Sequence, residues 1–376
     1  MTQHLMSVGY MPLVDSAPLI VAHELGFAAE EGLTLDLQKA ATWALLRDLL
    51  ALEKVDAAHM LAPVPISQAM GLGGSARFDA LAVLSRNGTV VGASRELAAR
   101  MHDNGLSAST RSAADIGHAL VAARRGTIRI GVPFPFSMHA ELLYYWLSSV
   151  GLPAPQGVEI RTVPPRMMSD AIAAGDIDVF CVGEPWGSLA VESGEAELIL
   201  PGASIWAAAP EKVLAVRKGW TETAPERSRR LIRAVWKAGK WLDRPENHMV
   251  TAEILSRPGY LDISADIIDR ALSGDLVTNR SGGRLHSSGF MAFHNNMASF
   301  PWKSQAAWIG HQIASRVGLD RLTAERTASD VFRTDIFRAA LADEAHALPP
   351  EDSKIEGAAH PGLFFDGRIF DIQQNE

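Results

Sequence analysis

One short pattern occurs twice in the chain, and this internal repeat limits the possible folds more than any other feature. The two copies are EKVDAAHMLAP (53–63) and GDIDVFCVGEPW (175–186), about 120 residues apart. In each copy an aliphatic residue precedes an aspartate, and a proline follows after six further residues: Asp56 and Pro63 in one, Asp178 and Pro185 in the other. The same spacing twice predicts two related structural units.

The segments before the two copies also match each other. Residues 7–40 and 128–163 both alternate short apolar runs with stretches that have apolar residues at three- and four-residue intervals. Each unit therefore predicts a β-α-β-α-β lobe, in which right-handed crossovers place the strands parallel. We expect an α/β fold with two lobes, each a mainly parallel sheet flanked by helices, and a ligand in the cleft between the lobes.

The rest of the chain is assigned around these lobes. Asn87-Gly88 is a turn signal, and residues 94–125 have the pattern of a surface insert or crossover. The predicted units are lobe 1 with C-terminal helices (1–110 and 206–345), lobe 2 (111–205) and a surface tail (346–376).

Composition excludes some classes of function. With 376 residues, 47% hydrophobic and 21% charged, the chain can form two domains with real cores. A net charge of -8 argues against a nucleic-acid binder that works through a basic surface. The single cysteine, Cys181, lies in an apolar segment and is expected in the core. The first residues show no signal peptide and no apolar run could span a membrane, so the expected location is the cytoplasm.

Common enzyme signatures are absent. The sequence has no GxxxxGK[ST], GxSxG or HExxH motif, and its 12 histidines have no metal-ligand spacing. The glycine-rich GLGGSA at 71–76 follows a helical segment, where a helix-ending turn is expected. We therefore expect no catalytic residues, no metal and no cofactor.

Several longer phrases resemble a known family. They are TWALLRD (42–48), LSRNG (84–88), FCVGEPW (180–186), PEKVLAVR (210–217) and FPWKSQAAW (300–308). With them the chain resembles the nitrate- and bicarbonate-binding proteins of the NrtA/CmpA type, over roughly residues 6–345. The resemblance implies a two-lobed periplasmic-binding-protein-like fold of type II.

The resemblance also implies a ligand-binding set. Matched motif by motif, the family's anion ligands fall on Trp43, Thr89, His139, Gly183 and Lys212. Thr89 stands where a glutamine is expected, so the donor there is shorter.

These residue types suit a small planar anion. Lys212 offers a positive charge, His139 offers an N–H, and the Gly183 backbone can be approached closely because it has no side chain. Thr42 and Ser137 are expected N-caps of the helices that carry Trp43 and His139, which would place both residues at positive helix ends.

The expected ligand is nitrate or nitrite. A bicarbonate site of this family is expected to recruit a metal cation near position 212, which a lysine would repel. Together with the cytoplasmic location, the resemblance favours the nitrate-sensor branch (NasS-like). That branch controls an RNA-binding antiterminator partner (NasT-like) of nitrate assimilation genes, without itself contacting nucleic acid or membrane.

Two alternatives remain open. The chain could be the solute-binding subunit of an ABC transporter for nitrate, bicarbonate or cyanate, for which a leader and neighbouring permease and ATPase genes would be the sign. It could also be an enzyme of the pyrimidine-precursor or sulfonate-related branch, which would require a cofactor-anchoring lysine or a metal cluster. Fold alone does not decide between them.

Overall fold

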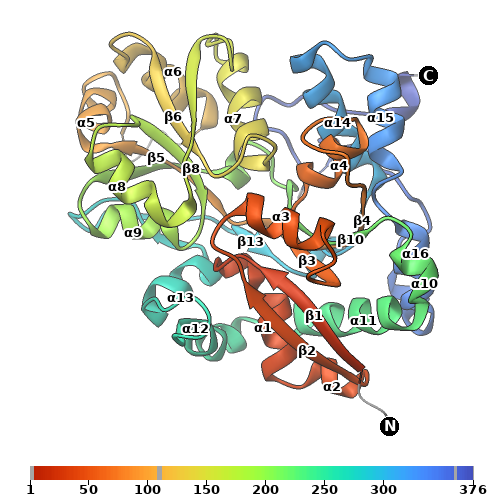
Figure 1. Cartoon of the computed structure of the whole chain (residues 1–376). Helices are drawn as coiled ribbons and strands as arrows, with labels where there is room; N and C mark the ends of the chain where they lie inside the picture. The colour runs from red at the N-terminus through yellow and green to blue at the C-terminus, as the bar shows by residue number, and fades with distance from the viewer. Residues whose placement is uncertain (1–3, 108–111, 360–361, 376) are drawn as a thin grey trace.

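The first lobe is built on a six-stranded sheet. The computed structural model describes residues 4–107, 112–359 and 362–375, and its two lobes are seen in Figure 1. The first sheet has the order β13-β4-β10-β3-β1-β2. Its strands are β1 (His4–Tyr10), β2 (Leu33–Lys39), β3 (Ala57–Leu61), β4 (Phe78–Asn87), β10 (Pro210–Arg217) and β13 (Met291–Ala292). Strand β1 pairs in parallel with β2 and β3, whereas β10 runs antiparallel to both of its neighbours.

The second lobe repeats this plan with five strands in the order β7-β6-β8-β5-β9. They are β5 (Thr89–Ser94), β6 (Ile128–Val132), β7 (Val158–Thr162), β8 (Val179–Gly183) and β9 (Ala196–Pro201). Strand β6 pairs in parallel with β7 and β8, and β5 runs antiparallel between β8 and β9. Each sheet is thus mainly parallel with one antiparallel strand inserted, and the first sheet has a second antiparallel strand, β13, at its edge. This agrees with the expected α/β fold of two sheet-and-helix lobes.

The two repeated aspartates have the same structural role. Asp56 Oδ2 accepts a hydrogen bond from the Ser7 backbone at 3.0 Å, and Asp178 Oδ2 accepts one from the Arg129 backbone at 2.9 Å. In both lobes the partners are 49 residues apart, and in both the aspartate N–H returns a bond to the same residue's carbonyl. The repeated pattern in the sequence therefore specifies how β1 is joined to β3 in the first lobe and β6 to β8 in the second.

Helices cover both sheets. In the first lobe they are α1 (Ala17–Glu24), α2 (Phe27–Glu30), α3 (Trp43–Ala51) and α4 (Pro63–Ala69). In the second lobe they are α5 (Arg95–Asp103), α6 (Ala113–Ala123), α7 (Met138–Ser149), α8 (Met168–Ala173) and α9 (Trp186–Glu192). The C-terminal part adds α10 (Trp220–Thr223), α11 (Pro225–Leu242), α12 (His248–Ser256), α13 (Ala265–Ser273), α14 (Lys303–Val317), α15 (Arg321–Ser329) and α16 (Thr334–Ala340), with the hairpin β11 (Asp275–Val277) and β12 (Arg284–His286).

The chain passes between the lobes at Asn87-Gly88, where both residues have positive φ angles of 57° and 89°. The returning segment lies beside this turn, because Asn87 donates from its backbone to Ala209 O at 3.0 Å and from its side chain to Ala207 O at 2.8 Å. Two crossing segments held together in this way form a natural hinge.

The predicted boundary of the second lobe was wrong. The boundary between residues 110 and 111 itself lies outside the described residues, but the crossing occurs earlier, because β5 is a strand of the second sheet and pairs with β8 and β9. Helix α5 then packs on the same lobe, so the segment read as a surface insert is part of its fold. The physical reason is that the Asn87-Gly88 turn directs the chain straight into the second sheet.

The C-terminal segment is more than a surface tail. Phe364 is buried and stacks on Trp206 with ring centroids 4.9 Å apart, and its ring lies 5.7 Å from that of Trp308 on α14. The hydroxyl of Tyr145 on α7 donates to Asp366 at 2.8 Å. The tail therefore bridges an aromatic cluster of the first lobe and a helix of the second.

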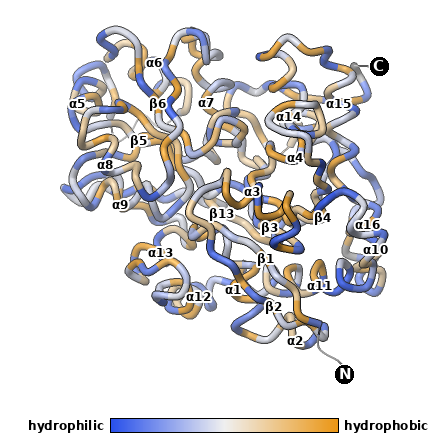
Figure 2. The backbone as a smooth tube through the Cα atoms, viewed as in Figure 1, coloured by the Kyte–Doolittle hydropathy of each residue, from blue (hydrophilic) through white to orange (hydrophobic). Residues whose placement is uncertain are grey.

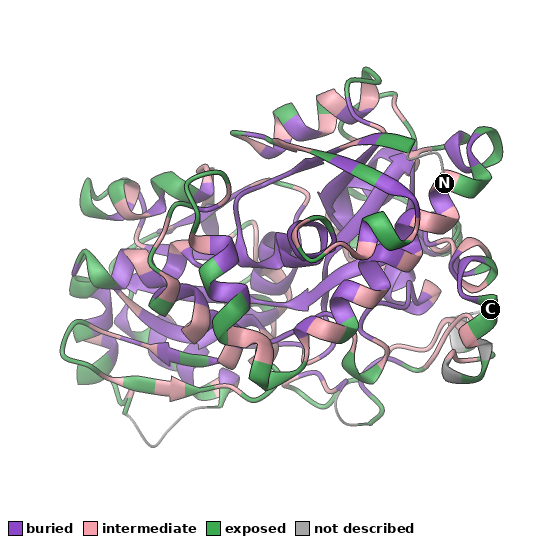
Figure 3. Ribbon diagram, turned by 90° about the horizontal axis from the view of Figure 1, so that it is seen from below, coloured by how far each residue is buried: buried purple, intermediate pink, exposed green. Residues whose placement is uncertain are grey.

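The strands form the interior of both lobes. Figure 3 shows the central strands of the sheets buried, whereas the edge strands β2 and β7 are partly exposed, and Figure 2 shows hydrophilic segments mostly at the periphery. Cys181 is fully buried on β8, as expected for a core residue, and burial raises the pKa of its thiol. Across the described parts of the chain, no helix combines the length and apolar character that a bilayer span requires.

Candidate functional site between the lobes

Two helix starts carry the predicted aromatic and histidine residues to the interface of the lobes. Helix α3 begins at Trp43, and the Thr42 hydroxyl accepts from Leu45 N at 3.1 Å; helix α7 begins just before His139, and Ser137 accepts from Ala140 N at 3.2 Å. Both predicted N-caps are thus confirmed. Each helix follows a parallel strand, so the starts of both helices lie at the carboxyl ends of their sheets.

Lys212 reaches the same place from the middle of the first sheet. Strand β10 has a register shift between Pro210 and Lys212, which pair with the successive residues Arg86 and Ser85. Glu211 is therefore the extra residue of a β-bulge, a device that redirects side chains. As a result Glu211 and Lys212, neighbours in a strand, both contribute to one cluster.

The cluster is a buried network of charges. Lys212 Nζ lies 2.7 Å from Asp15 Oδ2 and 2.8 Å from Glu211 Oε1. His59 Nε2 lies 3.1 Å from Asp15 Oδ1, and His139 Nδ1 lies 3.3 Å from Glu211 Oε1. None of the five residues is more than 1% exposed. The ammonium expected to stand alone is thus already paired with two carboxylates.

Protonation in the cluster follows from burial and charge together. Burial disfavours the charged form of Asp15, but Lys212 and His59 outweigh it and the pKa of Asp15 is lowered. Burial lowers the pKa of Lys212, but the two acids outweigh it and the pKa is raised. Burial raises the pKa of Glu211 to about 7 against the opposing effect of Lys212. Burial and the charge of Lys212 hold the pKa of His139 well below its usual value, so this imidazole is neutral near pH 7.

Several buried polar atoms in the cluster have no hydrogen-bond partner. They include the indole Nε1 of Trp43, both ring nitrogens of His139, His59 Nε2, both carboxylate oxygens of Asp15 and Glu211 Oε2. The Asp15 and His59 atoms lie within ion-pair distance of a partner, as does His139 Nδ1, whose approach to Glu211 lacks hydrogen-bond alignment. The Trp43 ring also lies 5.4 Å from Lys212 Nζ and 5.6 Å from the ring of His59. A buried donor without an acceptor is costly, so its presence beside a cation points to an acceptor that occupies the site.

Gly183 closes the site from the second lobe. A Cβ on this residue would stand 2.7 Å from Leu13 Cδ2, 3.6 Å from Asp15 Oδ2 and 3.7 Å from His139 Nε2. An added Cβ would press on the tip of the Leu13 side chain, so glycine at the end of β8 lets this strand approach the first lobe closely. Two bonds seal this contact, from Val14 N to Glu184 O at 3.0 Å and from Trp186 Nε1 to Pro12 O at 3.1 Å.

Thr89 is placed differently from the other four predicted residues. It pairs with Gly183 across β5 and β8 and is fully buried. Its hydroxyl lies against Gly202, where an added Cβ would stand 2.1 Å from Thr89 Oγ1. The structure thus brings Trp43, His139, Gly183 and Lys212 together, and Thr89 lies next to Gly183 on the neighbouring strand.

Three members of the cluster were not among the predicted residues: Asp15, His59 and Glu211. Asp15 follows the first strand directly, in the short helix Val14–Ser16, and His59 lies within β3. The position of Asp15 after a parallel strand was a usable signal. Glu211 gave none, because successive residues of a regular strand point to opposite faces.

A small cavity of about 220 Å³, the mouth of the interface, adjoins the cluster through Met11, whose backbone N–H donates to His59 Nδ1 at 3.5 Å. Its walls are formed by loops of both lobes and include Pro12, Lys39, Arg166 and Trp186. Lys39 Nζ is bonded to the carbonyl of Tyr260 at 2.9 Å, and the Arg166 guanidinium lies 5.7 Å from the Trp186 ring. The lining of this mouth contains two cations and no carboxylate.

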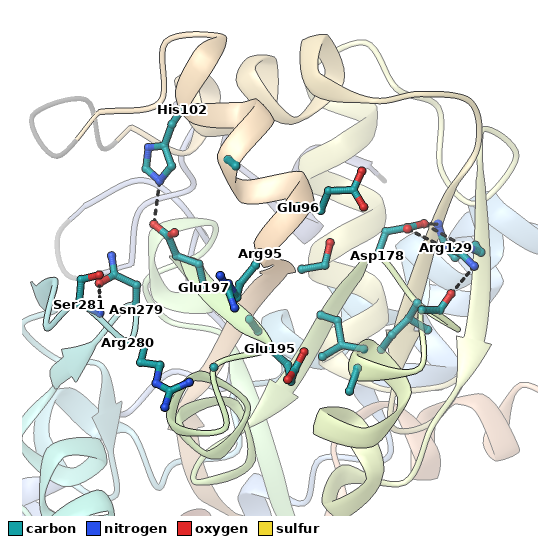
Figure 4. Close-up of a pocket in the computed structure, with 18 residues that line it drawn as sticks. Arg95, Glu96, His102, Arg129, Asp178, Glu195, Glu197, Asn279, Arg280 and Ser281 are labelled. Carbon is teal, nitrogen blue, oxygen red and sulfur yellow. Dashed lines mark hydrogen bonds and ion pairs between the residues drawn. The ribbon is translucent and has the colours of Figure 1, made fainter.

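A wider cavity of about 940 Å³ lies at the end of the second sheet's strands that is opposite to the cluster (Figure 4). Its charged residues largely neutralise one another: Arg129 pairs with Asp178 at 2.7 Å, and His102 with Glu197 at 2.9 Å. It is at the amino ends of β6 and β8, away from the cluster. Within the described residues, no group of three or more His, Cys, Asp or Glu side chains is arranged to hold a metal ion.

Comparison with known proteins identifies the family of this chain. The model of the NMT1-like family matches residues 2–256. The chain belongs to the NMT1-like family. Within it, this NMT1-like protein groups with NrtA/CmpA-like binding proteins, as the sequence phrases implied.

The named relatives are as follows. The chain is 35% identical over 344 residues to the nitrate import ATP-binding protein NrtC of Synechococcus elongatus, covering 90% of this chain and 50% of the relative. It is 30% identical over 373 residues to the nitrate/nitrite binding protein NrtA of Synechocystis, covering 97% and 81%. The crystal structure of the periplasmic nitrate-binding protein NrtA from Synechocystis PCC 6803 aligns with a TM-score of 0.87 and 26% identity, over 99% of this chain and 96% of that one. The chain thus spans about half the length of NrtC and most of NrtA.

Proposed function

We propose that this NMT1-like protein binds nitrate or nitrite between its two lobes. The observation that carries the proposal is the pair of buried, unpartnered donors beside Lys212, Trp43 Nε1 from the first lobe and the His139 imidazole from the second. A small planar oxyanion supplies acceptors to both lobes at once. Because the cluster is closed to solvent, the anion can enter only when the lobes separate, and its contacts then favour the closed state.

The role best supported by the relatives is that of the substrate-binding component of a nitrate importer. NrtA is named as a nitrate/nitrite binding protein, and NrtC as a nitrate import protein. By this proposal the chain captures the anion and delivers it to a transporter. This was the alternative in the sequence interpretation, and the relatives favour it over the cytoplasmic sensor.

A second candidate, the intracellular sensor, has one observation in its favour. The relative with 35% identity is an ATP-binding protein, and the segment of it that is similar to this chain makes up half of its length. ATP is held inside the cell, so a nitrate-binding segment of the kind that we propose, joined to an ATP-binding protein, is suited to read nitrate there. An antiterminator of the NasT type is then the partner, and its complex with this chain should dissociate in millimolar nitrate.

Calorimetric titration tests the binding proposal. Nitrate and nitrite are expected to bind, and bicarbonate with calcium to give no heat. Trp43→Phe keeps an aromatic side chain, although a smaller one, and removes the indole N–H, so Kd should rise roughly tenfold or more, as expected for a lost hydrogen bond to a charged ligand. Unchanged affinity in this variant, with nitrate bound, would place the anion elsewhere.

A further inference from the structure

The charges in the closed site do not favour an added anion. Lys212 contributes one positive charge, while Asp15 and Glu211 contribute two negative charges when both are ionised, and His59 and His139 are neutral. All are buried, so solvent screens these charges weakly. With both acids ionised, an entering anion would meet a site whose net charge is already negative.

The two acids differ in how firmly they are held as carboxylates. Asp15 has Lys212 at 2.7 Å on one oxygen and His59 at 3.1 Å on the other. Glu211 has Lys212 and His139 beside Oε1 alone, while its buried Oε2 has neither a hydrogen bond nor an ion pair within the described residues. The Asp15 oxygens also lack aligned hydrogen bonds, but each has a basic group at ion-pair distance. A carboxylate oxygen without a donor is the costlier one to keep charged. Glu211 is therefore the acid that gives up its charge when another anion arrives.

We propose that Glu211 takes up one proton from solvent when the anion binds, so that the anion and H⁺ enter the cleft together. This inference rests on the proposed nitrate or nitrite site. The charges balance, because the negative charge that Glu211 loses replaces the one that the anion brings. Lys212 remains an ammonium between Asp15 and the anion, and the protonated carboxyl becomes a hydrogen-bond donor beside it.

Groups on every neighbouring element support this assignment. Besides Lys212 on the same strand, Glu211 faces Asp15 from the loop after β1, His139 from α7 and Cys181 from β8, and His59 on β3 acts through Asp15. Burial holds the thiol of Cys181 and both imidazoles neutral near pH 7, and Asp15 stays ionised. Among these groups Glu211 alone has a pKa near physiological pH, raised by burial to about 7.

The sign of the pH dependence follows. Below about pH 7 Glu211 of the closed protein is already neutral, and the anion binds without further protonation. Above this pH the free protein must acquire the proton, so Kd rises by up to about tenfold for each pH unit. Anion affinity is thus highest in mildly acidic solution and falls as the solution becomes alkaline.

The test is calorimetry of nitrate binding between pH 6 and pH 9 in buffers of different ionisation enthalpy, which counts the protons taken up. The wild-type chain should take up close to one proton per nitrate above pH 8. Glu211→Gln should bind nitrate with a Kd that does not change with pH and with no proton uptake. Glu184→Gln is the matched control, because Glu184 is also buried near the interface with a pKa raised to about 7 but is not in contact with Lys212.

The outcomes separate the proposals. Wild-type binding with no proton uptake and a constant Kd overturns proton coupling and leaves the anion site intact. If Glu184→Gln binds nitrate without proton uptake, Glu184 is the carboxyl that takes up the proton, and the assignment to Glu211 is overturned. If nitrate gives no heat at any pH, the proposed function fails and the coupling fails with it. If Glu211→Gln does not fold, the number of protons that the wild-type chain takes up still decides whether a proton binds together with the anion.

Discussion

At the scale of single residues, the site is organised by compensation of charge. The sequence predicts a lone ammonium that neutralises an anion, whereas Lys212 is held by Asp15 and Glu211 in the closed structure. Its role is therefore structural, in addition to the ligand-binding role that we propose. A buried cation of this kind keeps two acids in place, and the site becomes neutral when Glu211 is protonated as proposed.

Lys212→Ala tests this double role. It should abolish nitrate binding and also lower the free energy of unfolding by about 3–5 kcal/mol, because two buried carboxylates lose their partner. Urea unfolding measures the loss. Lys54→Ala, at an exposed position, should change stability by less than about 0.5 kcal/mol. A Lys212→Ala protein as stable as the wild type would contradict the buried network.

At the scale of elements, one ion pair joins the lobes away from the site. Arg316 on α14 binds Glu141 on α7 through two bonds of 2.5 and 2.7 Å, and Glu141 is buried two residues after His139. Helix α14 packs on α4 of the first lobe, and α7 belongs to the second. Opening of the cleft must therefore strain or break this pair.

Arg316→Met should weaken nitrate binding, because the closed state would then contain an unpaired buried carboxylate. A several-fold rise in Kd is expected by calorimetry. The double variant Glu141→Leu/Arg316→Met removes both charges and should recover much of the affinity, since replacing a whole buried pair by apolar groups is often neutral. Equal affinities in all three proteins would show that this pair does not act on closure.

The tail is another element that joins the lobes. Phe364→Ala should lower stability by about 3 kcal/mol, because it leaves a cavity against Trp206 and Trp308. Ile369→Ala, 55% exposed in the same tail, should have little effect. Thermal unfolding compares the two, and similar melting temperatures would indicate that the tail is not docked in solution.

At the scale of the whole molecule, the duplication, the sheets and the interlobe position of the site follow from the sequence. Asp56 and Asp178 make equivalent hydrogen bonds to the neighbouring strand in the two lobes, and helix caps position Trp43 and His139. The charge network did not follow, because it depends on a β-bulge at Glu211 and on packing between distant segments. The lobe boundary was missed because local pattern does not reveal that β5 pairs with β8 and β9.

The net charge of -8 makes the mouth of the interface important for the rate of binding. Lys39→Gln/Arg166→Gln should reduce the association rate of nitrate several-fold at low salt, with little effect at high salt, because rim charges steer rather than hold a ligand. Arg95→Gln removes a charge at the distant cavity and should leave the rate unchanged. Stopped-flow measurements over a range of ionic strength decide between these outcomes.

The most direct test of the oxyanion site is a crystal structure of the chain grown with nitrate. We expect one planar anion between the lobes, within hydrogen-bond distance of Trp43 Nε1 and His139 and beside Lys212 Nζ. An anion bound elsewhere, with Lys212 still enclosed by Asp15 and Glu211 and the Trp43 indole N–H still unpartnered, would contradict it.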